Sequence, residues 1–295
     1  MSLPPALPGE QLDLQGVHVY VAGQGRPMLL VHSVNAAAAA AEVRPVYEHA
    51  QATHTVFALD LPGYGLSDRS DRPYTPRLMT DALHTVAEHI RQRCGPVPID
   101  ALAVSLGCEF LARAATEQPA HWGRLALVSP TGLRGTKTRR AAPGSVIGPP
   151  WVLKLLRGPG WGAPLFRGLT RPDVIAYFLR RTWGSKDIDL DLWRYDVLTT
   201  RVPGAEHAPL HFLAARLFSA DITTVYESLT QPVWMSHGTR GDFTDYRGMA
   251  VLKPARPWRR SVFQTGALPY FEVPEAFNCA WDAFLADATA PLSPA

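Results

Sequence analysis

The chain has 295 residues, of which 46% are hydrophobic and 19% are charged, and its formal net charge is +3. This length and apolar content predict one globular domain with a substantial core and room for an insert. The charged fraction argues against wholesale disorder, and the small net charge gives no reason to expect a nucleic-acid partner.

Cysteine usage and hydropathy indicate where the chain works. Its three cysteines, Cys94, Cys108 and Cys279, are far apart and lack the spacing of metal ligands. We interpret them as reduced thiols and expect a cytoplasmic protein without a bound metal. Residues 1–16 lack the basic and apolar run of a secretory signal, and no apolar stretch is long enough to span a membrane.

Short apolar runs alternate with helical patterns along most of the chain. Runs of this kind are typical of strands covered on both faces. They predict strands at 17–21, 27–32, 55–59, 99–104, 125–129, 233–236 and 261–264. Helices are expected after Thr75-Pro76, after Ser105 and from Pro274, and the six alanines at 36–41 are also read as part of a helix. This alternation predicts a mainly parallel sheet with helices on both faces.

The alternation breaks between residues 134 and 229, where no strand–helix rhythm is legible. We expect a helical cap there, inserted between two parts of a core at 1–133 and 230–295. From Arg134 to Arg181 there are ten lysines and arginines against one acid, Asp173, with tryptophans and leucines between them. Either the cap packs its apolar faces inward, or this segment makes a weak contact with a membrane surface or another anionic partner.

The strongest local signal is the sequence Ala101-Leu102-Ala103-Val104-Ser105-Leu106-Gly107. It places Ser105 on a tight turn between a buried strand and a helix, where small residues allow the strand and the helix to approach closely. Such a turn raises the serine hydroxyl above the sheet, and the N–H of Leu106 then points to where an oxyanion would form. The sequence therefore predicts a serine nucleophile at position 105.

A second motif, Asp60-Leu61-Pro62-Gly63-Tyr64-Gly65-Leu66-Ser67-Asp68, precedes the serine by about 40 residues. It resembles the loop after the fourth strand of α/β-hydrolases, in which these residues are mostly structural. The resemblance covers roughly residues 17–286. It implies the α/β-hydrolase fold, an eight-stranded, mostly parallel sheet with helices on both faces and a helical cap. The enzymes of this fold with an aspartate nucleophile are set aside because position 105 is serine.

The resemblance also assigns roles to the remaining site positions. Val34, in His32-Ser33-Val34-Asn35, would supply the second oxyanion N–H, while Asn35 would either cap the following helix or face the pocket. The acid of the triad would be Asp242, with Asp245 as the alternative. His237, at the end of the seventh strand, is interpreted as structural.

The base position is the exception. The family's histidine lies in a stretch that resembles G-H-x-P-x-x-E-x-P, and here that stretch begins Gly266-Ala267-Leu268-Pro269. Ala267 therefore occupies the base position, and no histidine follows His237. A serine hydroxyl is a poor nucleophile near neutral pH without a base within hydrogen-bond reach.

Four accounts of the missing histidine remain open. The first is a substitute base from His207 or His211, which share a face if their stretch is helical. The second is an alanine introduced to trap an inactive enzyme. The third is a pocket that binds without hydrolysing, and the fourth is a pocket that guides a reaction needing no triad. We expect an esterase or related acyl hydrolase acting on a small apolar substrate. The alternative is a non-hydrolytic ligand-binding protein. No cofactor is implied, and the oligomeric state is open.

Overall fold

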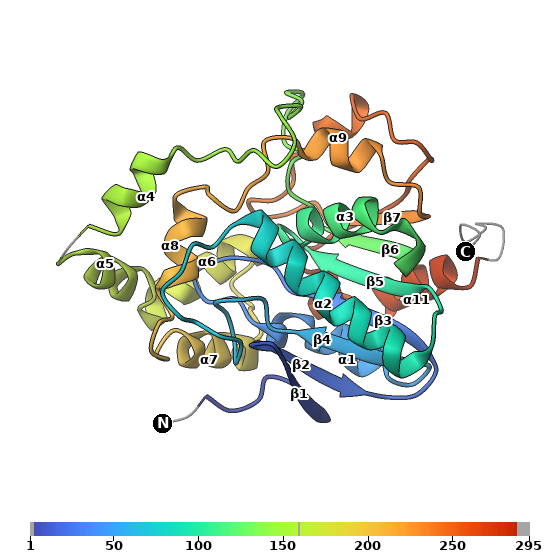
Figure 1. Ribbon diagram of the computed structural model, residues 1–295, viewed down its shortest axis with the longest axis horizontal. Coiled ribbons are helices and arrows are strands. Elements are labelled where there is room, and N and C mark those ends of the chain that lie inside the picture. The colour runs from blue at the N-terminus through green and yellow to red at the C-terminus, as the bar shows by residue number, and fades with distance from the viewer. Residues whose placement is uncertain (1–2, 159, 288–295) are drawn as a thin grey trace.

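The computed structural model describes residues 3–158 and 160–287. One eight-stranded sheet forms its centre, with helices on both sides (Figure 1). The strands are β1 (Glu10–Leu14), β2 (Val17–Ala22), β3 (Arg26–Val31), β4 (His54–Leu59), β5 (Ile99–Val104), β6 (Trp122–Val128), β7 (Val233–Gly238) and β8 (Arg259–Phe263). Their order is β1-β2-β4-β3-β5-β6-β7-β8. Strands β3 to β8 pair in parallel, whereas β2 is antiparallel to both β1 and β4. The predicted eight-stranded, mostly parallel sheet is confirmed.

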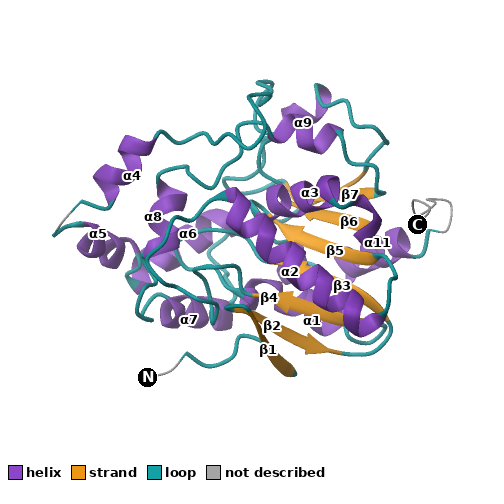
Figure 2. Ribbon diagram, in the orientation of Figure 1, coloured by secondary structure: helices purple, strands orange, loops and turns teal. Residues whose placement is uncertain are grey.

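The helices cover the two faces of this sheet (Figure 2). The α-helices are α1 (Arg44–Ala50), α2 (Pro76–Cys94), α3 (Gly107–Glu117), α4 (Pro150–Leu156), α5 (Gly162–Leu169), α6 (Pro172–Trp183), α7 (Leu190–Thr199), α8 (His207–Leu213), α9 (Ile222–Glu227), α10 (Pro269–Glu272) and α11 (Pro274–Leu285). Short 3-10 helices are η1 (Ala40–Val43), η2 (Pro119–His121) and η3 (Arg247–Ala250). Helices α2 and α3 pack on one face, and α1 and α11 pack on the other.

Local sequence explains where several of these elements begin and end. The hydroxyl of Thr75 accepts a hydrogen bond from the N–H of Leu78 and caps α2. Gly95 ends the same helix at a φ of 88°. Strands β5 and β6 are buried at every residue, as expected of central strands covered on both faces.

Two features differ from the sequence prediction. Strand β1 was not expected, because it is a short edge strand whose residues are mostly exposed. The prediction of a helix over the six alanines at 36–41 is wrong: only Ala40 and Ala41 are helical, in the 3-10 turn η1. A side-chain acceptor takes a backbone donor that a helix would use, since Asp60 Oδ1 accepts from Ala40 N.

The chain between β6 and β7 carries helices α4 to α9. Helices α4 to α8 lie beyond the carboxyl ends of the parallel strands, whereas α9 packs beside α3 (Figure 1). Ligands in open α/β sheets bind at this end of the strands. The cap boundaries at 134 and 229 stay a prediction.

Two further observations concern the chain as a whole. The three cysteines are free thiols, with Cys108 buried and Cys279 exposed. No helix within the described residues has both the length and the apolar character needed to cross a bilayer.

Candidate active site

Ser105 stands at the corner between β5 and α3. Its φ is 51°, in the left-handed region, and its N–H donates to the carbonyl of Val128 at 2.8 Å. A residue other than glycine pays about 1–2 kcal/mol for this conformation, and strain of this kind gathers at functional sites. A Cβ on Gly107 would lie 2.5 Å from the carbonyl oxygen of His32. Glycine at 107 therefore lets the start of α3 approach the loop that follows β3.

Ser105 opens into a cavity of about 130 Å³. The walls come from the loop after β3 and η1, the corner at Ser105, the loops after β6, β7 and β8, helices α6 and α8, and the segment that follows α8. Most of this surface is apolar, so the cavity suits a small apolar group. The lining residues are Ser33, Val34, Asn35, Glu42, Val104, Ser105, Leu106, Ser129, Thr131, Leu179, Thr182, Trp183, Phe212, Phe218, Phe243, Ala267 and Leu268.

Two backbone amides beside Ser105 are available as donors. Val34 and Leu106 both line the cavity and are 3% and 0% exposed. Within the described residues, no hydrogen bond is made by the N–H of either residue. Buried N–H groups without a partner are rare in folded proteins. Two of them at one cavity wall form an arrangement that can stabilise a developing oxyanion.

The loop after β8 brings Ala267 to the same cavity. Gly266 donates its N–H to Glu272 Oε1 at 2.6 Å, and Ala267 donates its N–H to the carbonyl of Thr182 at 2.9 Å. The carbonyl of Ala267 accepts from Ser129 Oγ at 2.7 Å. These three hydrogen bonds fix the backbone at position 267 in the cavity wall. No histidine belongs to the lining within the described chain.

Neither candidate for the acid lines this cavity. Asp242 is held by Arg181, with Oδ2 at 2.6 Å from Nε and Oδ1 at 2.8 Å from Nη2. Asp245 accepts from Arg247 and from the N–H of Gly135, and the bonds from Arg247 hold the pKa of Asp245 below its usual range. The N–H groups of Thr239 and Arg240 donate to the carbonyl of Thr265 in the loop after β8, whereas the N–H of Asp242 donates to the carbonyl of Arg181 in α6. Asp242 as the acid of a triad stays a prediction.

The histidines considered as substitute bases also lie outside the cavity lining. Helix α8 contains both His207 and His211, because Pro209 falls in its first turn, where no N–H is needed. His207 lies 3.8 Å from the carboxylate of Asp71. His211 is buried, its Nδ1 lies 2.9 Å from the carbonyl of His207, and burial lowers its pKa. Phe212 of the same helix reaches the cavity instead.

Other residues singled out from the sequence serve the framework. Asp60 is buried and accepts from Tyr20 Oη, Ala40 N and Leu66 N. His237 lies at the end of β7, where its ring stacks on Tyr246 with centroids 4.2 Å apart. Of the two roles that the sequence left open for Asn35, the structure shows the second: its Oδ1 accepts from Ala37 N ahead of η1 without capping a helix, and the residue lines the cavity.

The sequence reasoning missed Glu42. This buried glutamate of η1 lines the cavity with Ser105, and within the described lining it is the one ionisable side chain. The sequence did contain a signal for it. Glu42 is the one acidic residue directly after the six alanines, and these follow the loop that contains the expected oxyanion donor Val34. Because a regular helix was predicted over this run, the side chain of Glu42 was not expected to point into the cavity.

Comparisons with known proteins give the same architecture. A family model described as alpha/beta hydrolase fold matches residues 26–170. No curated protein sequence matches the chain. A probable hydrolytic enzyme from Pseudomonas aeruginosa PAO1 superposes with a TM-score of 0.73 at 19% identity, over 97% of this chain and 96% of that one. Cfl2 from Burkholderia cenocepacia gives 0.71 at 20% identity, over 93% and 94%. The 2-hydroxy-6-oxo-6-phenylhexa-2,4-dienoate hydrolase of Rhodococcus sp. strain RHA1 gives 0.70 at 16% identity, over 94% and 98%.

Identities this low establish the fold and leave the reaction open. The strand order, the corner at Ser105 and the family model agree on that fold. This chain is therefore a protein of the α/β-hydrolase fold.

Proposed function

We propose that the chain is a serine hydrolase that cleaves an ester or related acyl bond of a small apolar molecule. The hydroxyl of Ser105 attacks the acyl carbon, and the N–H groups of Val34 and Leu106 hold the oxyanion. The observation that carries this proposal is the strained corner at Ser105, beside two buried amides for which the described part of the chain holds no acceptor. Asp242 is kept as the acid that would orient a histidine if one stood at 267.

The apolar lining supports the proposed class of substrate. Leu179, Trp183, Phe212 and Phe218 surround the polar groups near Ser105. An apolar acyl or alcohol group gains free energy by leaving water for such a wall, at about 25 cal/mol per Å² buried. The small volume of about 130 Å³ favours a compact group at this point.

One observation favours a second function. The cavity lining contains no histidine within the described residues, and Ala267 stands at the position that the resemblance gives to the base. Losing the base of a serine triad typically costs on the order of 10⁴ to 10⁶ in turnover. A protein that binds a small ligand in this cavity without hydrolysing it is therefore the alternative.

Labelling with a p-nitrophenyl phosphonate ester distinguishes the two functions. A primed serine should form a covalent adduct, detected by intact-protein mass spectrometry and mapped to Ser105, while Ser105→Ala stays unlabelled. Ala267→His is the companion variant, and we expect it to raise ester hydrolysis by at least about 10³-fold. An unlabelled wild-type chain together with no gain in Ala267→His would favour the binding protein.

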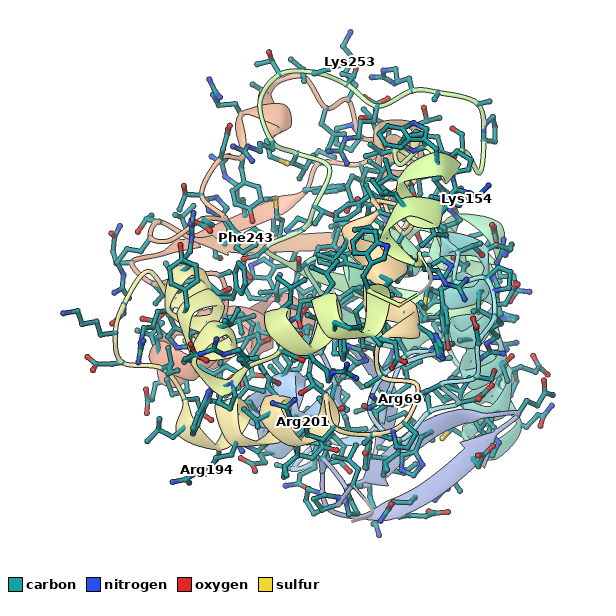
Figure 3. The ribbon with its side chains drawn as sticks, turned by 90° about the vertical axis from the view of Figure 1, so that its left-hand side faces the viewer. Arg69, Lys154, Arg194, Arg201, Phe243 and Lys253 are labelled. Atoms are coloured by element: carbon teal, nitrogen blue, oxygen red, sulfur yellow. The ribbon has the colours of Figure 1, made fainter. Side chains whose placement is uncertain are left out.

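The outer face of the cap supports a further proposal about partners, a weak contact with anionic membrane surfaces. Helix α4 buries none of its side chains, and it leaves Trp151 and Leu155 66% and 56% exposed. Trp161 is 40% exposed nearby in sequence, and Lys154 lies between the two apolar residues of α4. Figure 3 looks onto the side of the molecule that carries α4, with Lys154 labelled. Apolar side chains interleaved with cations suit an anionic lipid surface.

A further inference from the structure

The cavity contains an ionisable group that the proposed mechanism has not used. Glu42 belongs to η1, is 8% exposed, and lines the cavity together with Ser105 and Ala267. A carboxylate removed from water is costly unless hydrogen bonds or a cation compensate it. Within the described residues, no lysine or arginine pairs with Glu42.

Both oxygens of Glu42 are bound by one residue, Ser33. The N–H of Ser33 donates to Oε2 at 2.6 Å, and its hydroxyl donates to Oε1 at 2.8 Å. A carboxylate oxygen accepts up to two hydrogen bonds, so each oxygen keeps a site for another donor. The Ser33 hydroxyl lines the cavity as well. A hydroxyl in this position can relay a proton between the carboxylate and a group in the cavity.

Two other buried ionisable groups, Asp196 and Tyr270, lie close enough to Glu42 to sense its charge. Asp196 of α7 is buried, and its pKa is raised by burial and then by the charge of Glu42. Tyr270 of α10 is also buried, with a hydroxyl that has no hydrogen-bond partner. The charged groups on the other neighbouring elements are engaged elsewhere, because Asp60 accepts from Ala40 N and Arg44 is paired with Asp189.

Burial raises the pKa of Glu42 to about 7, although the two hydrogen bonds from Ser33 act in the opposite direction. A general base works best when its pKa is near the operating pH. Carboxyl groups tuned in this way by an apolar setting serve as acids and bases in enzymes.

We propose that Glu42 is the general base for Ser105 in this chain, a role that rests on the serine-hydrolase function proposed above. Glu42 takes the Ser105 proton directly, or through Ser33, whose hydroxyl passes its own proton to the carboxylate and receives the one from Ser105. The Ser105 oxygen bonds to the acyl carbon. The proton then moves to the leaving oxygen as the acyl C–O bond breaks. Water cleaves the acyl-enzyme by the same route: its proton goes to Glu42 and then to the departing Ser105 oxygen.

A merely structural role for Glu42 predicts something different. If the carboxylate only anchored Ser33, its loss would displace the neighbouring Val34 amide and slow the reaction equally at every pH. A base must be ionised to accept the proton, so the reaction should speed up as pH rises through its pKa. The pH profile separates the two roles.

The experiment measures the rate at which a p-nitrophenyl phosphonate ester labels Ser105 between pH 5 and 9, using the full chain. Glu42→Gln keeps the size of the side chain and removes its titration. Glu109→Gln is the matched control, because Glu109 is also buried, also accepts from one hydroxyl and one N–H, and does not line the cavity. Circular dichroism establishes that each variant is folded.

We expect the wild-type rate to rise through a single midpoint near pH 7. Glu42→Gln should label about 10²- to 10⁴-fold more slowly above pH 8 and lose the midpoint, while Glu109→Gln should follow the wild type. Equal rates and midpoints in Glu42→Gln and the wild type would overturn the inference and leave the proposed function standing. A uniform drop with an unchanged midpoint would also overturn it.

Two further outcomes are decisive. If Glu42→Gln does not fold, Glu42→Asp replaces it and should keep a midpoint with a reduced rate, so a flat profile in that variant would refute the role as base. An unlabelled Ser105 in the wild type would overturn this inference, and if Ala267→His also brought no gain in hydrolysis it would overturn the proposed function as well.

Discussion

Replacing Glu42 by glutamine should change how the stability of the protein depends on pH. Folding raises the pKa of this carboxyl from 4.5 to about 7. Each pKa unit corresponds to about 1.4 kcal/mol, so the ionised folded state carries a cost of about 3 kcal/mol. Below pH 4.5 the proton is present in both states and the cost is absent. As pH rises toward 7 the folded chain binds more protons than the unfolded chain, so stability falls.

Glutamine cannot titrate, so this cost is absent from the variant. The free energy of unfolding of Glu42→Gln, minus that of the wild type, should therefore rise by roughly 2.5 kcal/mol between pH 5 and pH 8. Glutamine can accept only one of the two hydrogen bonds from Ser33. Losing the other shifts the difference in unfolding free energy by the same amount at every pH. Urea unfolding followed by tryptophan fluorescence at four or five pH values measures it.

The matched control is Glu48→Gln, on the exposed side of α1. Its difference from the wild type should stay level over the same range. The reasoning about Glu42 is refuted if the Glu42→Gln difference is also level, or if it falls with rising pH. A falling difference would mean that the folded protein favours the carboxylate, as a cation beside it would cause.

Three other variants test separate parts of the account. Ser105→Gly should raise stability by about 1 kcal/mol in thermal melts, because glycine accepts the positive φ without strain, and should abolish labelling; lower stability would contradict the strain. Gly107→Ala should cost about 1–3 kcal/mol and slow labelling, since its Cβ would meet the backbone oxygen of His32; a neutral effect would deny that close approach. The chain should cosediment with vesicles rich in phosphatidylglycerol, and Trp151→Ala should weaken this binding; equal binding by the variant would exclude α4 as the contact.

The framework was predictable because its signals are local or set by chain order. Apolar runs located seven of the eight strands, and Thr75-Pro76 marked the start of α2. The corner at Ser105 followed from small residues between a strand and a helix. The expectation that Ala267 and Ser105 share a pocket depended on the resemblance, and the cavity contains both.

The rest depended on contacts between distant segments. The alanine run has high helix propensity, yet Asp60, from the neighbouring loop, captures one of its N–H groups. That tertiary contact turns Glu42 toward the cavity instead of along a helix. The partner of Asp242 could not be predicted either, because Arg181 belongs to α6, about 60 residues earlier in the chain. Cap contacts of this kind join segments that no local pattern connects.

A structure of the phosphonate adduct would test the central claim most directly. The account predicts phosphorus bonded to Ser105 Oγ, with one phosphoryl oxygen about 2.7–3.1 Å from both the Val34 and the Leu106 nitrogens. An adduct on another residue, or a phosphoryl oxygen that turns away from these two amides, would contradict it.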